Sequence, residues 1–370
     1  MRTIRVAILG HGRSGREIHA RFFRQDNRYE LVAVVDPIVR RRELAARDFG
    51  CETFDDHQPL LKRDDIDLIV DATPSHLHAT NTLELLKAGF HVVCEKPIAA
   101  KTQDVDKLVE AAKCSGKVFT VFQQSRFAPY FKKIREVVAS GLLGDIVQIS
   151  MSFNSFNRRY DWQTLKAMMG GSLLNNGSHA IDQALVLFGD GDPSVSCIMR
   201  KAVSHGDAED HILLTLTGPG RPIINIEISG CCVYRTWLYN IYGTCGGLKA
   251  NATEVTWRYF NPKRAPRLRL TRTPISNPDG TPGWCSDSIE WHERAWSTPP
   301  DDPYVLDHMT KRYYELLYKT ISKGTPFEIT HDEVRRQVRV IEQARKQNPD
   351  FYPSEDTSTT SKRQKKPRNK

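Results

Sequence analysis

The stretch Gly10-His11-Gly12-Arg13-Ser14-Gly15 lies between two segments of different pattern. The apolar run Arg5–Leu9 before it predicts a strand, and the segment Gly15–Arg24 after it has apolar residues four apart, which predicts a helix. In such a Gly-x-Gly-x-x-Gly turn the first glycine allows the tight bend, the second lets the backbone approach a pyrophosphate, and the third lets helix and strand pack closely. The N-terminus of the helix adds amide donors. The context therefore predicts a dinucleotide-binding turn.

An acidic residue ends the next predicted strand. Asp36 follows Leu31–Val35 and stands 21 residues after Gly15, where a carboxylate would accept hydrogen bonds from ribose hydroxyls. A carboxylate repels a 2′-phosphate, so Asp36 favours NAD. The three arginines at 40–42 could accommodate that phosphate, which keeps NADP open as the less favoured cofactor.

Short β-branched runs alternate with helical patterns over residues 1–125. The predicted strands are Arg5–Leu9, Leu31–Val35, Asp67–Ala72, Phe90–Cys94 and Val118–Phe122. Several of the helical segments between them end at a glycine, a common stop signal. This alternation predicts an α/β fold that begins with a Rossmann-type, doubly wound parallel sheet.

The alternation of strands and helices does not continue in the predicted second domain, residues 126–350. After a helix at Pro129–Ser140, strand-like runs cover Asp145–Phe153 and much of 197–260, which predicts a large, mostly antiparallel open sheet. Residues 261–303 are rich in Pro, Asp, Ser and Arg and are expected to form a long excursion. Helices return at 305–322 and 331–347.

The charge of the chain is unevenly distributed. The 370 residues carry a net charge of +9, and residues 351–370 supply +4 of it, so that segment is expected to be a basic, disordered tail. Elsewhere acids and bases alternate, which argues against a specific nucleic-acid partner. No run approaches the ~20 apolar residues of a membrane span, and no secretory signal is evident, so we expect a cytoplasmic protein without a membrane partner. The eight cysteines form no Cys-x-x-Cys pair, and no metal site is expected.

A lysine follows the predicted strand Phe90–Cys94. In Glu95-Lys96-Pro97 the lysine lies at the carboxyl end of a parallel strand, where open α/β sheets bind ligands. The segment from Thr73-Pro74 to His76 leaves a neighbouring strand at the same edge and could cover a nicotinamide ring.

Taken together, these motifs resemble the glucose–fructose oxidoreductase, inositol dehydrogenase and MocA (Gfo/Idh/MocA) family. The matching segments are the glycine turn with Asp36, Thr73-Pro74, Glu95-Lys96-Pro97, Gln124-x-Arg126 with Pro129, Gly141-x-x-Gly144, and the stretch from Gly170 to Asp182 that contains His179. The resemblance implies a Rossmann domain followed by an α/β domain whose open sheet often forms the oligomer interface, hence a homodimer or homotetramer. It also implies oxidation of a secondary alcohol or reduction of the ketone.

The resemblance also assigns roles by position. It makes Lys96 and His179 the catalytic residues. Many members carry an aspartate where this chain has Asn175, and an amide cannot accept a proton. We therefore expect His179 to take the hydroxyl proton and Lys96 mainly to position the hydroxyl. The residues expected at the cofactor are Gly10, His11, Gly12, Arg13, Ser14, Gly15, Asp36, Thr73, Pro74, His76, Glu95, Lys96 and Gln124.

Substrate contacts are expected from polar and aromatic residues near His179. Sugar faces stack on aromatic rings, and sugar hydroxyls pair with planar polar groups. The expected contacts are Lys96, Arg126, Arg158, Tyr160, Trp162, Asn175, His179 and Asp182. For Asp182, orientation of the imidazole, substrate binding and a purely structural role all stay open.

Three functions are compatible with these residues. The leading one is an NAD-dependent dehydrogenase that oxidises a sugar, a sugar derivative such as a glycoside, or a cyclitol. The second is an enzyme that cleaves glycosides by transient oxidation and regenerates its cofactor in each turnover. The third is a cofactor-binding regulator without catalysis, against which Lys96 and His179 argue.

Overall fold

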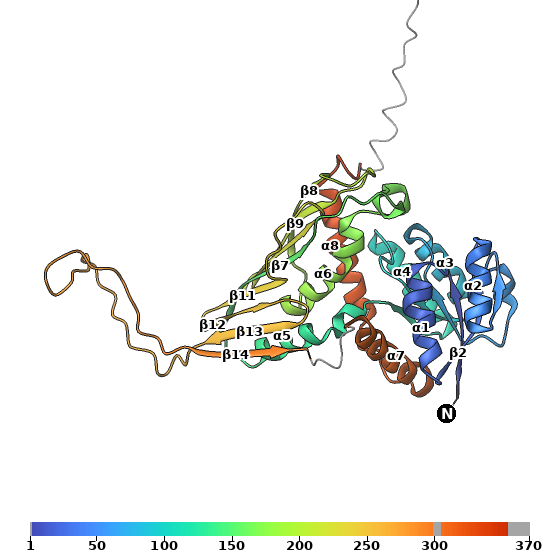
Figure 1. Cartoon of the computed structure of the whole chain (residues 1–370), viewed down its shortest axis with the longest axis horizontal. Helices are drawn as coiled ribbons and strands as arrows, with labels where there is room; N and C mark the ends of the chain where they lie inside the picture. Colours follow the sequence, from blue (N-terminus) through green and yellow to red (C-terminus); the bar gives the residue numbers. More distant parts are fainter. Residues whose placement is uncertain (1, 299–304, 354–370) are drawn as a thin grey trace, which may run out of the picture.

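The computed structural model describes residues 2–298 and 305–353. Figure 1 shows two lobes, each built around one sheet. The expected tail falls almost wholly on 354–370, outside the described residues.

The first sheet has six parallel strands in the order β3-β2-β1-β4-β5-β6. Its strands are β1 (Ile4–Leu9), β2 (Tyr29–Val35), β3 (Glu52–Phe54), β4 (Leu68–Asp71), β5 (His91–Cys94) and β6 (Phe119–Val121). The helices between them are the π-helical turn η1 (Gly15–Ala20), α1 (Arg21–Gln25), α2 (Val39–Phe49), α3 (His78–Lys87) and α4 (Thr102–Ser115), with short 3₁₀ turns η2 (Gln58–Lys62) and η3 (Ser75–Leu77). Strands β1, β4 and β5 are almost fully buried, because helices cover both faces.

The second sheet has eight strands in the order β14-β13-β12-β11-β7-β10-β9-β8, and only the β7–β10 pair is parallel. Its strands are β7 (Ile146–Asn154), β8 (Ser194–Arg200), β9 (His211–Thr217), β10 (Ile223–Ser229), β11 (Tyr239–Gly243), β12 (Gly246–Ala250), β13 (Glu254–Tyr259) and β14 (His292–Ser297). The accompanying helices are η4 (Gln124–Phe127), α5 (Pro129–Ala139), η5 (Trp162–Thr164), η6 (Lys166–Met168), α6 (Ser172–Phe188), α7 (Val305–Lys323) and α8 (His331–Lys346). These two sheets confirm the expected fold class.

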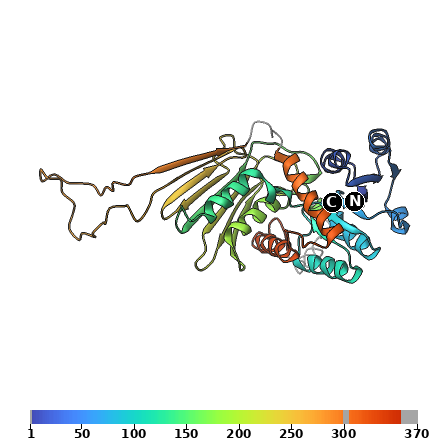
Figure 2. The same ribbon diagram turned by 90° about the horizontal axis from the view of Figure 1, so that it is seen from below.

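Helices cover one face of the second sheet. Side chains of α5, α6 and α8 pack with the inward residues of its strands into one core, and Figures 1 and 2 show these helices on the same side. Along β8 and β9, buried residues alternate with exposed ones, as expected for a sheet with one open face.

The two hydrophobic cores do not divide the chain at a single point near residue 125. Tyr313, Tyr314 and Leu317 of α7, and Val334 of α8, are buried in the core of the first sheet, whereas Ile341 of α8 belongs to the core of the second. Helix α8 therefore joins the two lobes and fixes one against the other.

The excursion is shorter in the structure than the expected range of residues 261–303. It runs from Phe260 to Trp291 and projects from the body of the molecule as a long arm (Figures 1 and 2). Residues 292–297, expected within it, form β14 and pair with β13, while 299–303 lie outside the described residues.

Candidate active site

A cavity of about 1370 Å³ lies where the two lobes meet. Pockets for drug-sized ligands measure about 300–1,000 Å³, so this one has room for a dinucleotide and a small substrate. Many of the expected site residues line it. These are Gly10, Gly12, Arg13, Ser14, Asp36, Thr73, Pro74, Glu95, Lys96, Tyr160, Trp162, Asn175 and His179.

The glycine turn has the geometry that a pyrophosphate needs. Gly10 has a φ of +86°, and a Cβ there would lie 2.6 Å from the carbonyl oxygen of Ala72. A Cβ on Gly15 would lie 1.9 Å from the carbonyl oxygen of Gly10. At Gly12 the nearest atom to an added Cβ is Arg41 Nη1, at 3.7 Å, so the missing side chain leaves open space on the cavity side. Gly10 and Gly15 must therefore be glycines because of close packing, and Gly12 leaves room for a ligand to approach the backbone. This arrangement fits a bound dinucleotide.

Asp36 is buried at the end of β2 and held in place from several sides. One oxygen, Oδ2, accepts hydrogen bonds from the His11 amide at 2.8 Å and from Arg41 Nη1 at 3.3 Å. The other accepts one from the Ile38 amide at 2.9 Å. A carboxylate has about four acceptor positions, so Asp36 can still accept a hydrogen bond from a ribose hydroxyl.

The side chain of His11 points away from the cavity. It is buried edge-on against Phe49, with 5.9 Å between ring centroids, and neither ring nitrogen has a hydrogen-bond partner among the described residues. Burial lowers the pKa of His11, which keeps the ring neutral. His11 contributes its backbone amide to Asp36 and no side chain to the cavity.

Lys96 is held at the cavity wall by Asn175 of α6. Its Nζ donates to the Asn175 carbonyl oxygen at 3.2 Å and to Oδ1 of the same residue at 3.1 Å. Burial, and after it the charges of Arg13 and Arg159, lower the pKa of Lys96 against the opposing effect of Glu95. The lysine therefore links the first lobe to α6 of the second at the cavity wall.

Glu95 is fixed by a buried chain of polar contacts. Its Oε2 accepts a hydrogen bond from the Lys96 amide at 3.1 Å, and Oε1 lies 3.3 Å from His19 Nε2. The other ring nitrogen of His19 lies 2.7 Å from the hydroxyl of Tyr314. This chain ties Glu95 and the backbone of Lys96 to the helix that follows the glycine turn.

His179 lies on α6 one turn after Asn175 and also lines the cavity. Its Nδ1 is 3.0 Å from the hydroxyl of Ser125 in η4, which leaves Nε2 as the nitrogen available to a ligand. Burial, and after it the charge of Lys96, lower the pKa of His179 to about 3. The imidazole is therefore neutral at physiological pH.

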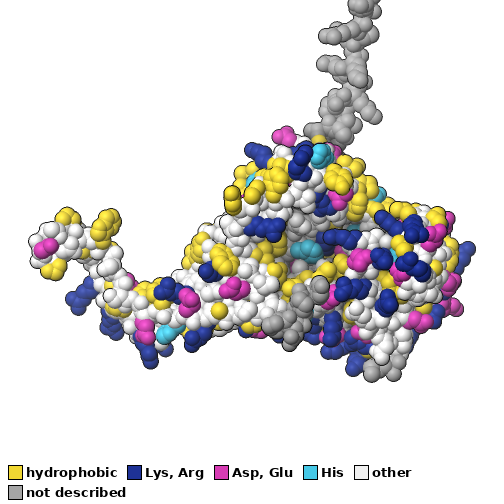
Figure 3. Space-filling model, in the orientation of Figure 1, with side chains coloured by type: hydrophobic (Ala, Val, Ile, Leu, Met, Phe, Trp, Pro, Cys, Tyr) yellow, Lys and Arg dark blue, Asp and Glu magenta, His cyan; other side chains and the backbone are white. Residues whose placement is uncertain are grey.

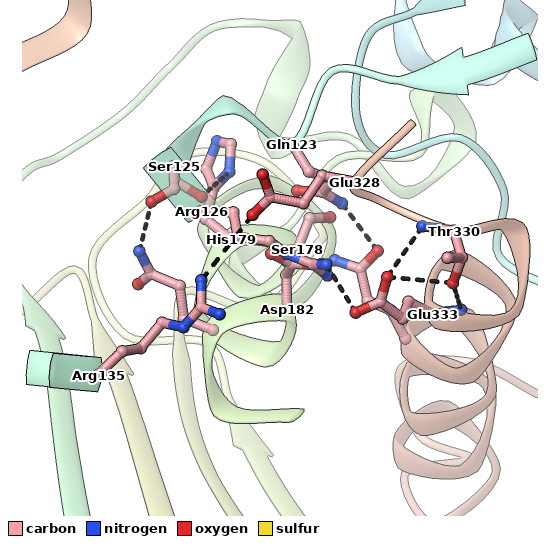
Figure 4. Close-up of polar contacts among 12 residues, drawn as sticks. Gln123, Ser125, Arg126, Arg135, Ser178, His179, Asp182, Glu328, Thr330 and Glu333 are labelled. Atoms are coloured by element: carbon pink, nitrogen blue, oxygen red, sulfur yellow. Dashed lines mark hydrogen bonds and ion pairs between the residues drawn. The ribbon is translucent and has the colours of Figure 1, made fainter. Parts of the chain in front are cut away.

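Arg126 and Asp182 do not reach the cavity. Neither residue is among those that line it, and Figure 4 shows the two paired with each other. Arg126 Nε donates to Asp182 Oδ2 at 3.0 Å, and Nη2 donates to Oδ1. Arg126 Nη1 also donates to Glu333 of α8 at 2.7 Å. The exposed fractions are 4% for Arg126 and 2% for Asp182, so the expected substrate contacts are not available to these residues. Instead they hold α6 against η4, next to the Ser125–His179 contact.

Four other expected residues are also absent from the cavity wall that the described residues form, and the buried Gly15 is one of them. Arg158 is exposed on the loop after β7, Gln124 is buried in η4, and His76 lies partly buried in η3. Tyr160 and Trp162 do line the cavity, and Tyr160 is 87% exposed at its rim.

Sequence reasoning missed several residues at this site. Arg159 lines the cavity in place of its neighbour Arg158 and donates to Gln163, whose Oε1 also accepts from Asn175 Nδ2 at 3.4 Å. Ser125 was passed over between Gln124 and Arg126. In a loop, as at Arg159, or in a turn as short as η4, the sequence carries no periodic signal of which of two adjacent side chains turns inward.

A buried glutamate sets the start of α6. Glu209 accepts a hydrogen bond from the Leu173 amide at 2.9 Å and another from the Tyr352 hydroxyl at 2.6 Å. A Cβ on Gly171, whose φ is +109°, would lie 2.5 Å from Glu209 Oε1. The first turn of α6 is thus capped by a residue distant in sequence, and Gly171 must be a glycine for that carboxylate to fit.

Within the described ranges, 2–298 and 305–353, no helix combines the length and apolar character of a membrane span. In the same ranges, His, Cys, Asp and Glu side chains form no cluster that could hold a metal ion.

Comparison with known proteins connects this geometry to a family. Residues 4–123 match a family model described as an oxidoreductase family with an NAD-binding Rossmann fold. Residues 131–249 match the model of the GFO/IDH/MocA C-terminal domain.

Curated relatives of the chain have several activities. The scyllo-inositol 2-dehydrogenase (NADP(+)) IolW of Bacillus subtilis is 26% identical over 92% of this chain and 93% of its own length. The D-glucoside 3-dehydrogenase of Escherichia coli is 32% identical over 50% of this chain and 54% of its own. The 2,7-anhydro-N-acetylneuraminate hydratase of Escherichia coli is 26% identical over 68% of each chain.

Solved structures share the fold. An NAD-binding protein from Listeria innocua superposes with a TM-score of 0.77, covering 94% of this chain and 97% of its own at 22% identity.

Proposed function

The chain belongs to the GFO/IDH/MocA family of NAD-binding oxidoreductases, and on that premise we propose that it oxidises a secondary hydroxyl of a sugar, a sugar derivative or a cyclitol. One observation carries this proposal. Lys96 of the first lobe and His179 of the second line the same cavity as the glycine turn and Asp36. The relatives that act on an inositol and on a glucoside support this substrate class.

The chemistry requires a hydride acceptor and a proton acceptor. A bound nicotinamide cofactor would supply the acceptor for the hydride of the carbinol carbon. The protein must then receive the hydroxyl proton, and a general base works best when its pKa lies near the working pH.

From the sequence, we expected His179 to take the hydroxyl proton and Lys96 to position the hydroxyl. The surroundings of the two side chains favour the opposite assignment. His179, with its pKa at about 3, holds a proton poorly at neutral pH. The pKa of Lys96 is lowered from a high ordinary value, which brings its neutral amine closer to the working range. We therefore assign proton acceptance to Lys96 Nζ and a hydrogen bond to the reacting hydroxyl to His179 Nε2.

The pH dependence of kcat/KM separates these two assignments. If Lys96 is the acceptor, kcat/KM for alcohol oxidation rises with pH until Lys96 is deprotonated, and it shows no bend near pH 6.5. If the profile of kcat/KM bends near pH 6.5 and the bend disappears in His179→Gln, His179 is the proton acceptor instead. The measurement is initial rate against pH with saturating cofactor, for the wild type and for His179→Gln.

A substrate panel tests the proposed reaction itself. Free sugars, inositols, sugar acids and glycosides are each incubated with the enzyme and NAD or NADP. The proposal expects reduced nicotinamide to form in proportion to a ketone product for at least one of these four groups of substrate. If the protein binds the cofactor but turns over no substrate of the panel, the result argues for the third function, a cofactor-binding regulator without catalysis.

The hydratase relative favours a second candidate, a reaction that oxidises its substrate only transiently. Such an enzyme would convert a glycoside or anhydro-sugar without net production of reduced nicotinamide. Product appearing while the cofactor absorbance stays constant identifies this alternative in the same panel.

For the cofactor we propose NAD, since the buried carboxylate of Asp36 would repel a 2′-phosphate bound beside it. Arg41 also lines the cavity, and a relative is named for NADP(+), so the choice depends on Asp36. Asp36→Ser should lower kcat/KM for NAD relative to NADP by about 10- to 100-fold, because hydrogen bonds to a charged group contribute about 1.5–3 kcal/mol. Glu43→Ser, on the exposed side of α2, removes the same charge as a control and should leave the ratio unchanged. An unchanged ratio of kcat/KM for NAD to that for NADP in Asp36→Ser would show that Asp36 does not bind the ribose hydroxyls.

A further inference from the structure

The contact between His179 and Ser125 determines which ring nitrogen of His179 carries a proton. The ring is neutral at physiological pH, so it donates a hydrogen bond from one nitrogen and accepts at the other. Nδ1 lies 3.0 Å from the hydroxyl oxygen of Ser125, as Figure 4 shows. Either the hydroxyl donates to Nδ1, or Nδ1 donates to the hydroxyl oxygen, and the two cases leave Nε2 with opposite roles.

The surroundings of Ser125 fix the direction of this hydrogen bond. Among the residues that the structure describes, His179 Nδ1 is the only hydrogen-bond partner of the Ser125 side chain. Ser125 is 8% exposed and is not among the residues that line the cavity. If Nδ1 donated, the hydrogen of the serine hydroxyl would be buried without an acceptor, which is unfavourable. If the hydroxyl donates, both groups are satisfied and the imidazole proton is on Nε2.

Further buried hydrogen bonds hold Ser125 in place. Gln183 of α6 donates from Nε2 to the carbonyl oxygen of Ser125 at 2.7 Å, and its Oε1 accepts from the Tyr239 hydroxyl at 2.6 Å. Gln183 and Tyr239 are both fully buried. Because a carbonyl oxygen can only accept, the Gln183 amide has one orientation here. These bonds fix η4 against α6, so the serine hydroxyl stays beside the imidazole.

The charged groups near His179 are consistent with a neutral ring. Burial is the largest cause of its lowered pKa, the charge of Lys96 lowers the pKa further, and Glu95 acts in the opposite direction. Glu95 already accepts a hydrogen bond from the Lys96 amide. On η4 and α6 themselves, the charges of Arg126 and Asp182 compensate each other in a buried ion pair. No second proton is therefore favoured on the imidazole.

We propose that Ser125 is a positioning residue that holds His179 with its proton on Nε2, so that His179 donates a hydrogen bond to the reacting oxygen and takes no proton from it. His179 lines the cavity between the lobes. Figure 3 shows the hollow between the lobes, with histidine (cyan) and basic (dark blue) side chains around it. The catalytic consequence rests on the proposed function, whereas the position of the proton does not.

A donor at His179 complements an acceptor at Lys96. The substrate hydroxyl oxygen accepts from Nε2–H, and its own hydrogen faces the neutral amine of Lys96. In the oxidation, the O–H bond breaks and its proton goes to Lys96 Nζ, while the electron pair of the C–H bond leaves with the hydrogen as hydride to the oxidised nicotinamide. Negative charge develops on the oxygen, so the hydrogen bond from Nε2 becomes stronger in the transition state.

Nitrogen NMR of the full chain tests the position of the proton without any substrate. In protein that carries isotope-labelled histidine, couplings to the carbon-bound ring hydrogens distinguish Nδ1 from Nε2, and the chemical shifts report which of them is protonated. The signals of His179 are those that disappear in His179→Gln. We expect a protonated Nε2 and an unprotonated Nδ1 at neutral pH, with and without NAD. A proton on Nδ1, or a doubly protonated ring, would overturn the proposal.

Ser125→Asp reverses the hydrogen bond, because a carboxylate only accepts and Nδ1 must then hold a proton. At alkaline pH, where the ring of this variant is neutral, Nε2 has no hydrogen to donate. There kcat should fall by about 10²-fold, the lower end of the loss when one donor to a developing oxyanion is removed. Ser125→Thr keeps the hydroxyl, so the proton should stay on Nε2 and kcat should stay close to the wild-type value.

The matched control is Ser140→Asp, which adds the same charge at the exposed end of α5 and should change neither the NMR signals of His179 nor kcat. Wild-type kcat in Ser125→Asp, with the proton shown to be on Nδ1, would overturn the donor role. The wild-type spectrum locates the proton even if Ser125→Asp does not fold. A protein that turns over no substrate would refute the proposed function and leave the NMR result unaffected.

Discussion

Lys96→Met lowers kcat by about 10²- to 10⁴-fold, the usual contribution of a general base, while the affinity for NAD changes little. Methionine keeps most of the length and the apolar stem of lysine but has no amine to receive the hydroxyl proton or to bond Asn175. The glycine turn and Asp36 are untouched, so cofactor binding should persist. Single-turnover rates and NAD titration by calorimetry measure the two effects separately.

A control variant removes a lysine elsewhere in the same lobe. Lys113 is exposed on α4, and Lys113→Met should leave both kcat and NAD affinity as in the wild type. If Lys96→Met turns over within about tenfold of the wild type, the loss is too small for a general base. The lysine would then serve only to position the hydroxyl, as the sequence alone suggested.

Asp182→Ala destabilises the protein by about 3 kcal/mol, the lower end of the range for a broken buried ion pair. It leaves the Arg126 guanidinium buried with only Glu333 as a charged partner, and that remaining pair is why the lower end is expected. The free energy of unfolding, from urea titration, is the measurement.

The double variant Arg126→Met, Asp182→Leu provides the comparison. It replaces both charges by apolar groups, so it should recover most of the lost stability. An Asp182→Ala protein with unchanged stability and a raised KM would instead place Asp182 at the substrate, in conflict with its burial away from the cavity wall.

The first lobe was largely predictable because its signals are local. The glycine turn, Asp36 and the buried strands each have a pattern within a few residues. Strand β3 was missed, since Glu52–Phe54 is too short to show a period. In the second sheet, Gly246-Gly247 reads as a turn, yet both residues lie in β12, where β13 approaches so closely that a Cβ on Gly246 would be 2.2 Å from the Arg258 carbonyl oxygen.

The site was predictable where a motif places a residue at the end of a strand, as with Lys96, and less so on α6. Helical spacing puts His179 and Asp182 near each other, but it does not say which of them turns toward the cavity. That depends on η4, which contacts both, and on Glu209, which caps α6 from a distant part of the chain. Such contacts between elements far apart in sequence leave no local pattern.

The central claim is that Lys96 and His179 converge on one reacting carbon beside a bound nicotinamide. A crystal structure of the protein with NAD and an unreactive substrate analogue tests it most directly. We predict the pyrophosphate over Gly12, and Lys96 Nζ and His179 Nε2 both within hydrogen-bond distance of one analogue hydroxyl next to nicotinamide C4. A diphosphate bound elsewhere, or either side chain turned away from that hydroxyl, would contradict the account.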